Sequence, residues 1–429
     1  MPMVLSLIRR FVPKPVFGAY HFVLALIAAA VYRHPSEKLI VVGVTGTNGK
    51  SSTVQFIGRI LEHTGRRVGW TTTVGFKIAE REWVNDKKMT MLGRFQTQRF
   101  LRQMVDAGCA VAIIETSSQG IAQSRHVGIH YDIAVFTNLT PEHIEAHGGF
   151  EAYKAAKGKL FAALARAKEK TIHGTPVKKA SVVNVLDEHA AYVLSFGAGQ
   201  AYPFGKQATD VVMNKNGTTF SIADTAFHFK PIGRFNFENV LAAITTCQAL
   251  GLTLRDIADG VSRLEPVPGR LEVIDEGQSF TVIVDYAPEP AALNATYEAL
   301  ALIGGRRLIH VLGSTGGGRD VARRRVLGQM AAGHAAIVIV TNEDPYDDDP
   351  SAIIEDVAAG AREHGKRDGI DLFALLDRQE AVNKAMAIAQ EGDIVLMTGK
   401  GSEPVMAVAH GRKIPWDDRA AARKALHHL

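Results

Sequence analysis

The sequence predicts an α/β protein with two consecutive parallel-sheet domains, and three observations lead to this fold class. Apolar runs alternate with amphipathic runs along most of the 429 residues, as in βα repeats. The alternation stops at residues 170–232, around the turn signal Asn216-Gly217, and restarts after Pro266-Val-Pro-Gly269. A glycine-rich loop follows the first apolar run. We therefore expect a P-loop parallel-sheet domain and then a Rossmann-like doubly wound domain.

The individual elements follow from the same pattern. In the first domain, strands are expected at residues 39–44, 110–115 and 132–137, and helices at 52–63, 95–107 and 150–167. Short runs at 181–185, 210–213, 218–222 and 226–229 predict a small antiparallel section, followed by helices at 237–251 and 253–263. In the second domain, strands are expected at 280–286, 307–313, 335–341 and 393–398, with helices at 289–302, 321–333, 350–364 and 378–390. The predicted divisions are residues 1–36, 37–268 and 269–429.

The composition indicates a soluble globular protein, with 46% hydrophobic and 22% charged residues. The formal net charge is +5, but most of it lies in residues 1–36, so the remainder is near neutral and gives no support for nucleic-acid binding. The two cysteines, Cys109 and Cys247, lie in apolar contexts far apart. They indicate buried thiols in a reducing cytoplasm rather than a disulfide framework or a zinc site.

Residues 1–36 are basic and apolar. Arg9, Arg10, Lys14 and Arg33 occur there without an acid, and the apolar run at 22–32 is too short to span a bilayer. Two interpretations remain open. The segment is either a basic amphipathic element that makes peripheral contact with an anionic membrane, or a helix packed on the first domain.

The glycine-rich loop predicts a phosphate site. Gly46-Thr-Asn-Gly-Lys-Ser51 lies between a predicted strand and a predicted helix, where backbone N–H groups and the positive helix end point at an anion. Lys50 could neutralise phosphate charge, and the Ser51 hydroxyl could reach Mg²⁺. The full P-loop pattern has a glycine where this chain has Val44, so an ordinary βα turn is the alternative.

Polar side chains also follow the next two strands. Glu115 ends one strand, and a carboxylate there can hold the magnesium of a nucleotide, although an edge carboxylate without a ligand is the alternative. His143 follows the other strand and could bind a metal or act as a base. In the helix after it, Lys154, Lys157 and Lys159 could all belong to a solvated face.

Eight short motifs occur in a fixed order. They are Gly46-Thr-Asn-Gly-Lys-Ser51, Glu115-Thr-Ser-Ser118, Thr137-Asn-Leu-Thr-Pro-Glu-His143, Tyr153-Lys-Ala-Ala-Lys157, Gly233-Arg-Phe-Asn-Phe-Glu-Asn239, Pro266-Val-Pro-Gly-Arg270, Asp285-Tyr-Ala287 and Gly399-Lys-Gly-Ser-Glu403. Together they resemble the Mur ligase family over residues 37–429, and most closely the MurE type, which adds the third residue of the peptidoglycan stem peptide.

The resemblance implies roles for individual residues. For ATP it implies Gly46, Thr47, Asn48, Gly49, Lys50, Ser51, Ser52, Asn239 at adenine, Arg270 at the γ-phosphate and Asp285 at the ribose. For two Mg²⁺ ions it implies Ser51, Glu115, His143 and a carbamylated Lys157. For the muramoyl-peptide it implies Ser117 and Arg125, and for the incoming amino acid Arg319, Asp344, Tyr346, Gly399 and Glu403. Lys50, Lys157, His143 and Arg270 would be the catalytic residues.

Three departures from the family pattern concern the substrates. About 36 residues precede the first domain, where MurE-type enzymes carry a domain that grips uridine diphosphate, so the acceptor could lack that group. The Asp-Asn-Pro-Arg motif of diaminopimelate-adding relatives is Glu343-Asp344-Pro-Tyr346 here, which predicts a cationic or neutral side chain on the preferred amino acid rather than meso-diaminopimelate. At two positions where the family has histidine, this chain has Pro288 and Ser402.

The sequence therefore predicts a monomeric, cytoplasmic, ATP-dependent amide ligase of cell-wall precursor synthesis. It would activate a carboxylate as an acyl phosphate, which an amine then attacks. A Mur-like ligase of another pathway, of the folylpolyglutamate or amino-acid polymer type, is the alternative within the same class of enzyme. A nucleotide-binding subunit without ligase activity is the alternative from a different class.

Overall fold

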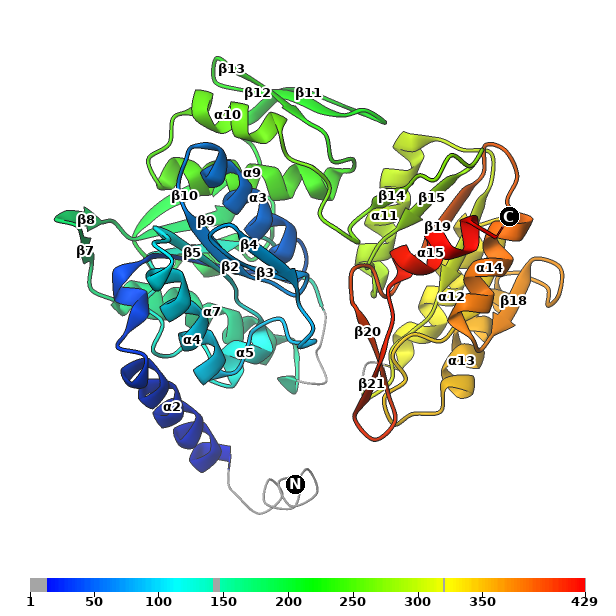
Figure 1. Cartoon of the computed structure of the whole chain (residues 1–429), viewed down its shortest axis with the longest axis horizontal. Coiled ribbons are helices and arrows are strands. Elements are labelled where there is room, and N and C mark those ends of the chain that lie inside the picture. The colour runs from blue at the N-terminus through cyan, green and yellow to red at the C-terminus, as the bar shows by residue number, and fades with distance from the viewer. Residues whose placement is uncertain (1–13, 142–146, 319–320, 429) are drawn as a thin grey trace.

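The computed structural model describes residues 14–141, 147–318 and 321–428, which form two α/β units (Figure 1). The first unit is built on an eight-stranded sheet and the second on a six-stranded sheet. Both sheets are mainly parallel, as the βα alternation predicts. The predicted α/β fold class is therefore confirmed.

The eight-stranded sheet has the order β10-β9-β6-β1-β5-β2-β3-β4, in which β10 to β2 are parallel and β3 and β4 are antiparallel additions. Its strands are β1 (Ile40–Thr45), β2 (Val68–Thr71), β3 (Gly75–Ile78), β4 (Arg81–Val84), β5 (Val111–Glu115), β6 (Ile133–Phe136), β9 (Ala180–Asn184) and β10 (Gln200–Phe204). β1 lies between β5 and β6, so the loops that follow these three strands meet at one edge of the sheet.

Helices cover both faces of this sheet. On one face, α3 (Lys50–His63), α9 (Arg234–Ala249) and α10 (Leu254–Ser262) share a core with Phe56, Trp70 and Phe229. On the other face, α4 (Arg94–Asp106), α5 (Ser118–Ala122), α7 (Phe150–Arg166) and α8 (Ala190–Leu194) enclose Met104 and Phe161. Both cores consist of buried apolar side chains, which hold the strand ends in fixed positions.

The antiparallel section is smaller than expected. It contains β11 (Ala208–Asn214), β12 (Gly217–Ile222) and β13 (Thr225–Phe229). The turn that joins the first two is Lys215-Asn216, one residue before the predicted Asn216-Gly217, because Gly217 already pairs with Asn214. The run at 181–185 was wrongly assigned to it, because β9 pairs in parallel with β6 and β10 in the main sheet. A separate short hairpin joins β7 (Lys170–Ile172) and β8 (Thr175–Val177).

The six-stranded sheet has the order β14-β15-β19-β16-β17-β18, with β14 as an antiparallel edge. Its strands are β14 (Glu272–Ile274), β15 (Thr281–Val284), β16 (Leu308–Leu312), β17 (Ile337–Thr341), β18 (Leu372–Leu375) and β19 (Ile394–Met397). α11 (Pro290–Ile303), α12 (Ala322–His334) and α13 (Pro350–Glu363) cover one face, while α14 (Arg378–Ile388) and α15 (Asp418–Leu426) cover the other.

A hairpin of β20 (Val405–Val408) and β21 (Arg412–Pro415) lies on the side of the second unit that faces the first (Figure 1). Its Lys413 ammonium donates to the Lys87 carbonyl of the first unit, over 3.1 Å. The sequence pattern missed this hairpin. Through this hydrogen bond, β21 of the second unit contacts the loop after β4 of the first unit.

Before the first strand, helix α2 (Lys14–Val31) packs against α4, and a 3₁₀ turn η1 (Pro35–Lys38) leads into β1. Ala25, Ala28 and Ala29 are buried in this contact, as the packed-helix interpretation expects. Within the described residues, no helix is long and apolar enough to cross a membrane.

Candidate functional site

The glycine-rich loop connects β1 to α3 as predicted. Gly49, at the start of the helix, has φ = 81°, a left-handed conformation that favours glycine. A Cβ atom at Gly46 would collide with the Thr137 hydroxyl, and one at Gly49 with the Asn239 side chain. These two glycines let the loop pass between neighbouring segments.

The first turn of α3 is open to an anion. No described side chain caps this helix, whereas Ser117, Thr253 and Asp377 cap the helices that follow them. The N–H groups of the first turn therefore have no capping oxygen from the described residues. The Lys50 ammonium lies 2.5 Å from the Thr47 carbonyl of the same loop. This arrangement of backbone dipoles and one ammonium group suits a phosphate.

Ser51 and Glu115 lie together beside this loop. The Ser51 hydroxyl donates to the Glu115 carboxylate over 2.7 Å, and the Thr73 backbone N–H donates to the same oxygen over 2.7 Å. Glu115 is 2% exposed and lies at the carboxyl end of β5. An alcohol and a carboxylate are ligands that Mg²⁺ accepts, so the predicted pair fits a magnesium ion.

Lys157 on α7 reaches the other side of the loop. Its buried ammonium donates to the Gly46 carbonyl over 2.6 Å and lies 4.4 Å from the centre of the Tyr153 ring. The Tyr153 hydroxyl in turn lies 3.0 Å from the Thr47 hydroxyl. Of the three lysines on this helix, Lys157 is therefore the one that approaches the loop, while Lys154 pairs with Glu151.

His143, the remaining predicted metal ligand, lies outside the described residues, as does Arg319. Among the residues that the structure does describe, no group of three or more His, Cys, Asp or Glu side chains could hold a metal ion. Ser51, Glu115 and Lys157, the other three predicted ligands, lie around one loop.

The segment after β6 is tied to the glycine-rich loop. Asn138 accepts the Asn48 backbone N–H on its side chain over 2.8 Å, and its carbonyl accepts the Thr47 N–H over 2.9 Å. The Thr137 hydroxyl donates to the Asn48 carbonyl over 2.7 Å. These contacts fix the loop conformation. The Asn239 side chain packs against Gly49, so it lies beside the same loop.

Three loops meet in the second unit. A Cβ atom at Gly269 would collide with the backbone of Ser402, and the Gly399 N–H donates to the Tyr286 carbonyl over 2.7 Å. The Arg270 guanidinium lies 4.3 Å from the centre of the Tyr286 ring. The predicted residues at 270, 285, 399 and 403 therefore occupy adjacent loops.

Asp285 is buried within this group. Burial raises the pKa of its carboxyl, although the Thr296 hydroxyl and Arg270 act in the opposite direction. The Thr296 hydroxyl donates to it over 2.6 Å and the Leu271 N–H over 3.1 Å. Asp285 thus also holds the polypeptide that follows Arg270 in place.

A compact charged cluster contains three of the predicted amino-acid contacts, Asp344, Tyr346 and Glu403. Lys400, 0% exposed, donates to both Asp344 oxygens over 3.0 Å and to Glu403 over 2.7 Å. Lys88, from the first unit, forms an ion pair with Asp344 and lies 3.5 Å from Glu403. Its ammonium is 5.7 Å from the centre of the Tyr346 ring. Two ammonium groups therefore balance two carboxylates at the junction of the units.

The pKa values in this cluster reflect burial and charge together. Burial alone would raise the pKa of Asp344, but Lys400 and Lys88 hold it below its usual value. Burial lowers the pKa of Lys88, against the opposing effect of Glu403. Burial and the neighbouring Asp344 charge raise the pKa of Glu343 to about 7. Glu343 lies against Gly399, where φ is 104° and a Cβ atom would collide with the Glu343 carboxyl.

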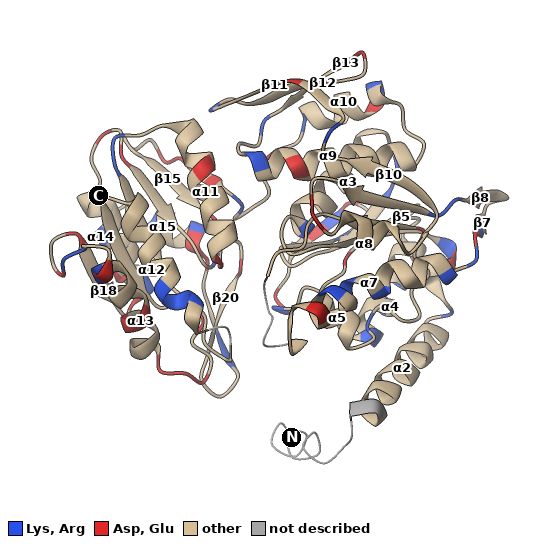
Figure 2. Cartoon of the chain, turned by 180° about the vertical axis from the view of Figure 1, so that it is seen from behind, with Lys and Arg blue, Asp and Glu red and all other residues tan. Residues whose placement is uncertain are grey.

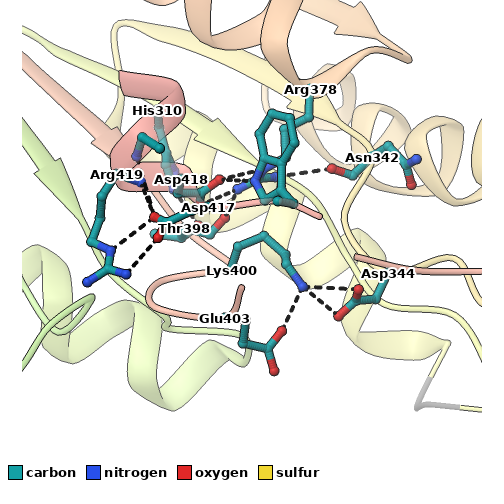
Figure 3. Close-up of polar contacts among 12 residues, drawn as sticks. His310, Asn342, Asp344, Arg378, Thr398, Lys400, Glu403, Asp417, Asp418 and Arg419 are labelled. Carbon is teal, nitrogen blue, oxygen red and sulfur yellow. Dashed lines mark hydrogen bonds and ion pairs between the residues drawn. The ribbon is translucent and has the colours of Figure 1, made fainter. Parts of the chain in front are cut away.

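A buried arginine supports the two loops that carry this cluster (Figure 3). Arg378 makes two hydrogen bonds of 2.8 Å to Asp418. It also donates to the Asn342 carbonyl over 3.1 Å and to the Thr398 carbonyl over 2.8 Å. Asn342 and Thr398 directly follow β17 and β19, so Arg378 fixes the chain where it enters both loops.

The predicted muramoyl-peptide contacts lie on the first unit. The Ser117 hydroxyl accepts the Gly120 N–H over 3.2 Å and caps α5. Arg125 donates to the Gln123 side chain over 2.7 Å and to the Met91 carbonyl. Burial, and the positive charge of Arg94, lower the pKa of Arg125. This pair of nearby guanidinium groups is suited to an anionic ligand.

The two units touch through residues of the candidate site itself. Besides the Lys88–Asp344 ion pair, the Asn48 amide donates to Glu289 over 2.5 Å. Sequence reasoning missed Lys88, Glu289 and Arg378. The position of Glu289 just after the Asp285-Tyr-Ala287 motif was the one available signal.

Comparisons with known proteins agree with this geometry. The profile of the Mur ligase middle domain matches residues 44–247, and the profile of the Mur ligase glutamate ligase domain matches residues 269–401. A UDP-N-acetylmuramoyl-L-alanyl-D-glutamate–2,6-diaminopimelate ligase from Geobacillus kaustophilus is 37% identical over 416 residues, covering 94% of this chain and 82% of the relative. A UDP-N-acetylmuramyl-tripeptide synthetase from Roseiflexus is 38% identical over 425 residues, covering 95% and 82%.

Solved structures show the same architecture. A structure of a UDP-N-acetylmuramoyl-L-alanyl-D-glutamate–2,6-diaminopimelate ligase has a TM-score of 0.60 at 29% identity, covering 91% of this chain and 78% of that one. The Mycobacterium tuberculosis folylpolyglutamate synthase complexed with ADP and AMPPCP has a TM-score of 0.68 at 17% identity, covering 92% and 93%. The second likeness concerns the fold alone.

Proposed function

The chain belongs to the Mur ligase family, and we propose that it joins an amino acid to a muramoyl-peptide precursor of peptidoglycan with consumption of ATP. The observation that carries the proposal is the similarity to MurE-type ligases along 94% of the chain, at 37% identity. The proposed domains are residues 1–36, 37–268 and 269–429. The proposal places the enzyme in the cytoplasm, because ATP is supplied there.

The proposed chemistry couples two steps. An oxygen of the acceptor carboxylate attacks the γ-phosphorus of ATP, and ADP leaves with the electrons of the broken P–O bond. The amine then attacks the acyl phosphate, and phosphate leaves with one oxygen of the original carboxylate. The amine loses a proton as the amide forms. The protein must therefore bind crowded phosphate oxygens and align two substrates.

The residues around the glycine-rich loop are suited to the first step. We assign the phosphates to residues 46–52, with Lys50 as the neutralising cation. Arg270, from the second unit, is assigned to the γ-phosphate, while Asn239 and Asp285 are assigned to adenine and ribose. Support comes from the contact between Asn48 and Glu289, which links the loop to the second unit four residues after Asp285.

We assign magnesium to Ser51, Glu115, His143 and Lys157. Magnesium, when bound, would offset the negative charge of the phosphate oxygens. Lys157 would carry a carbamate for the second ion, which would replace a positive by a negative charge. Its ammonium lies at the Gly46 carbonyl, so the modified side chain would end beside the phosphate loop.

The acceptor is assigned to Ser117 and Arg125, and the incoming amino acid to Arg319, Asp344, Tyr346, Gly399 and Glu403. We propose that this amino acid has a cationic or neutral side chain and that meso-diaminopimelate is not preferred. Support comes from Lys88, whose ammonium already lies beside Asp344 and Glu403. A substrate ammonium could take the same place, whereas Asp344 and Tyr346 offer no cation to a distal carboxylate.

The test measures phosphate release from ATP in the presence of Mg²⁺, UDP-N-acetylmuramoyl-L-alanyl-D-glutamate and one amino acid at a time. Mass spectrometry then gives the mass of the product. We expect a product heavier by one amino-acid residue, and none with Lys50→Ala. Lys424→Ala, on the exposed side of α15, is the control variant and should retain activity. The absence of a ligated product with every amino acid would refute the proposal, as would full turnover by Lys50→Ala.

A further inference from the structure

Helix α2 turns large apolar side chains toward solvent, unlike an ordinary surface helix. The side that packs on the first unit is lined by small residues, Ala25, Ala28 and Ala29. The outward side carries large apolar side chains that are between 45% and 61% exposed, namely Val16, Tyr20, Phe22, Val23, Leu26, Ile27 and Val31. A surface helix normally turns such side chains toward the core.

The exposed side chains form a continuous face. Val16, Tyr20, Val23, Ile27 and Val31 are spaced by three or four residues, so they line one stripe of the helix. Phe22 and Leu26 widen this stripe on one side. Figures 1 and 2 show α2 extending away from the first unit in both views. A contiguous apolar face of this kind indicates an interaction surface.

The sequence around this helix is basic. Residues 1–36 contain Arg9, Arg10, Lys14 and Arg33 and no acidic residue. Arg33 is exposed just after the helix, and Arg99 is exposed on α4, against which α2 packs. An apolar helix face with basic residues at its ends is typical of elements that lie in the headgroup region of anionic membranes.

We propose that the outward face of α2 docks on an anionic lipid surface. The helix would lie on the membrane rather than cross it, since it is not apolar and long enough to span a bilayer. A second copy of the chain fits this face less well. A symmetric contact would bring the basic ends of two α2 helices together, and the helices themselves carry no acid to neutralise them, whereas anionic headgroups would neutralise them. This inference does not depend on the proposed ligase reaction.

The test is co-sedimentation of the full chain with vesicles of phosphatidylcholine containing about 30% phosphatidylglycerol. The α2 variant carries Val23→Glu and Ile27→Glu, which keep helix-forming residues at exposed positions. The matched control carries Val212→Glu and Ile370→Glu, which are 56% and 59% exposed elsewhere and change the charge equally. Light scattering without vesicles reports the oligomeric state of each protein.

We expect the unmodified chain and the control to bind these vesicles, and the α2 variant to bind at least about tenfold more weakly. Binding should also fall on pure phosphatidylcholine and at high salt, because the basic residues contribute. No binding to the anionic vesicles, equal binding to the neutral ones, or unchanged binding of the α2 variant would overturn the inference. If the unmodified chain and the control are dimers that do not bind vesicles, and the α2 variant is a monomer, the face belongs to a contact with a second copy.

Discussion

Replacing Arg378 by Met tests how the second unit holds the loops of its charged cluster. The Arg378 side chain is 1% exposed and that of Asp418 is 0% exposed, so the substitution leaves a buried carboxylate without its cation. Breaking a buried pair on one side costs about 3–5 kcal/mol. For a unit of this size, each kcal/mol of lost stability lowers the melting temperature by about 2–4 °C. The substitution should therefore lower the melting temperature by roughly 6–20 °C.

The control is Arg325→Met, which breaks the ion pair with Glu363. The Arg325 side chain is 62% exposed and that of Glu363 is 42% exposed, so water can replace the lost partner, and we expect a cost of at most about 1 kcal/mol. Calorimetry of the two variants measures the stability difference. Steady-state kinetics should show a KM for the amino acid raised by about tenfold or more in Arg378→Met, with a smaller change for ATP, because the loops after β17 and β19 shift.

Equal melting temperatures for the two variants would refute this reasoning, as would equal changes of KM for the amino acid and for ATP. A second substitution sharpens the test. Adding Asp418→Leu to Arg378→Met removes the unpaired carboxylate and should recover more than half of the lost stability. No recovery would mean that packing around Arg378, rather than its charge, determines the loss.

Three further predictions concern residues of the candidate site. Lys157→Ala should lower turnover by about 100-fold, with partial recovery when short carboxylic acids are added in place of the carbamate; full activity without them would reject the role of Lys157. Asp344→Asn combined with Tyr346→Arg should raise the ratio of diaminopimelate to lysine turnover by about tenfold, and an unchanged ratio would exclude these residues as specificity determinants. The pKa of Glu343 is raised to about 7 from 4.5, so the folded chain binds more protons than the unfolded chain between these values. Stability should therefore fall by about 3 kcal/mol as the pH rises through this window, and urea unfolding of Glu343→Gln should lose that dependence; an unchanged pH profile would contradict it.

The main strands and helices could be predicted because they depend on local patterns. β1, β5 and β6 are buried apolar runs, and each is followed by polar residues at a strand end. The loop from Gly46 to Ser51 was predicted for the same reason, since its glycines and lysine are adjacent in the sequence. These features need no knowledge of which strands are neighbours.

Features that depend on long-range pairing were missed or misassigned. β9 resembles the short strands after it, and only its pairing with β6 places it in the main sheet. Strands β2, β3 and β4 are four residues each and follow no clear βα pattern. Arg378 lies at the start of a helix, where an arginine is usually exposed. Its burial arises because β17, β19 and α15 meet there.

The site shows the same division. Lys157 could not be distinguished from Lys154 and Lys159 by spacing, and the fold brings only one of them to the Gly46 carbonyl among the described contacts. Lys88 carried no signal, because its partner Asp344 is far away in the sequence and belongs to the other unit. Contacts between units cannot be derived from local patterns.

The most direct test of the central claim uses an acceptor whose D-glutamate carboxylates carry ¹⁸O. If the enzyme activates a carboxylate as an acyl phosphate, each amide bond formed should release one phosphate that contains one ¹⁸O atom, together with ADP. Unlabelled phosphate, or release of AMP, would contradict the account, because the carboxylate oxygen would then not have attacked the γ-phosphorus.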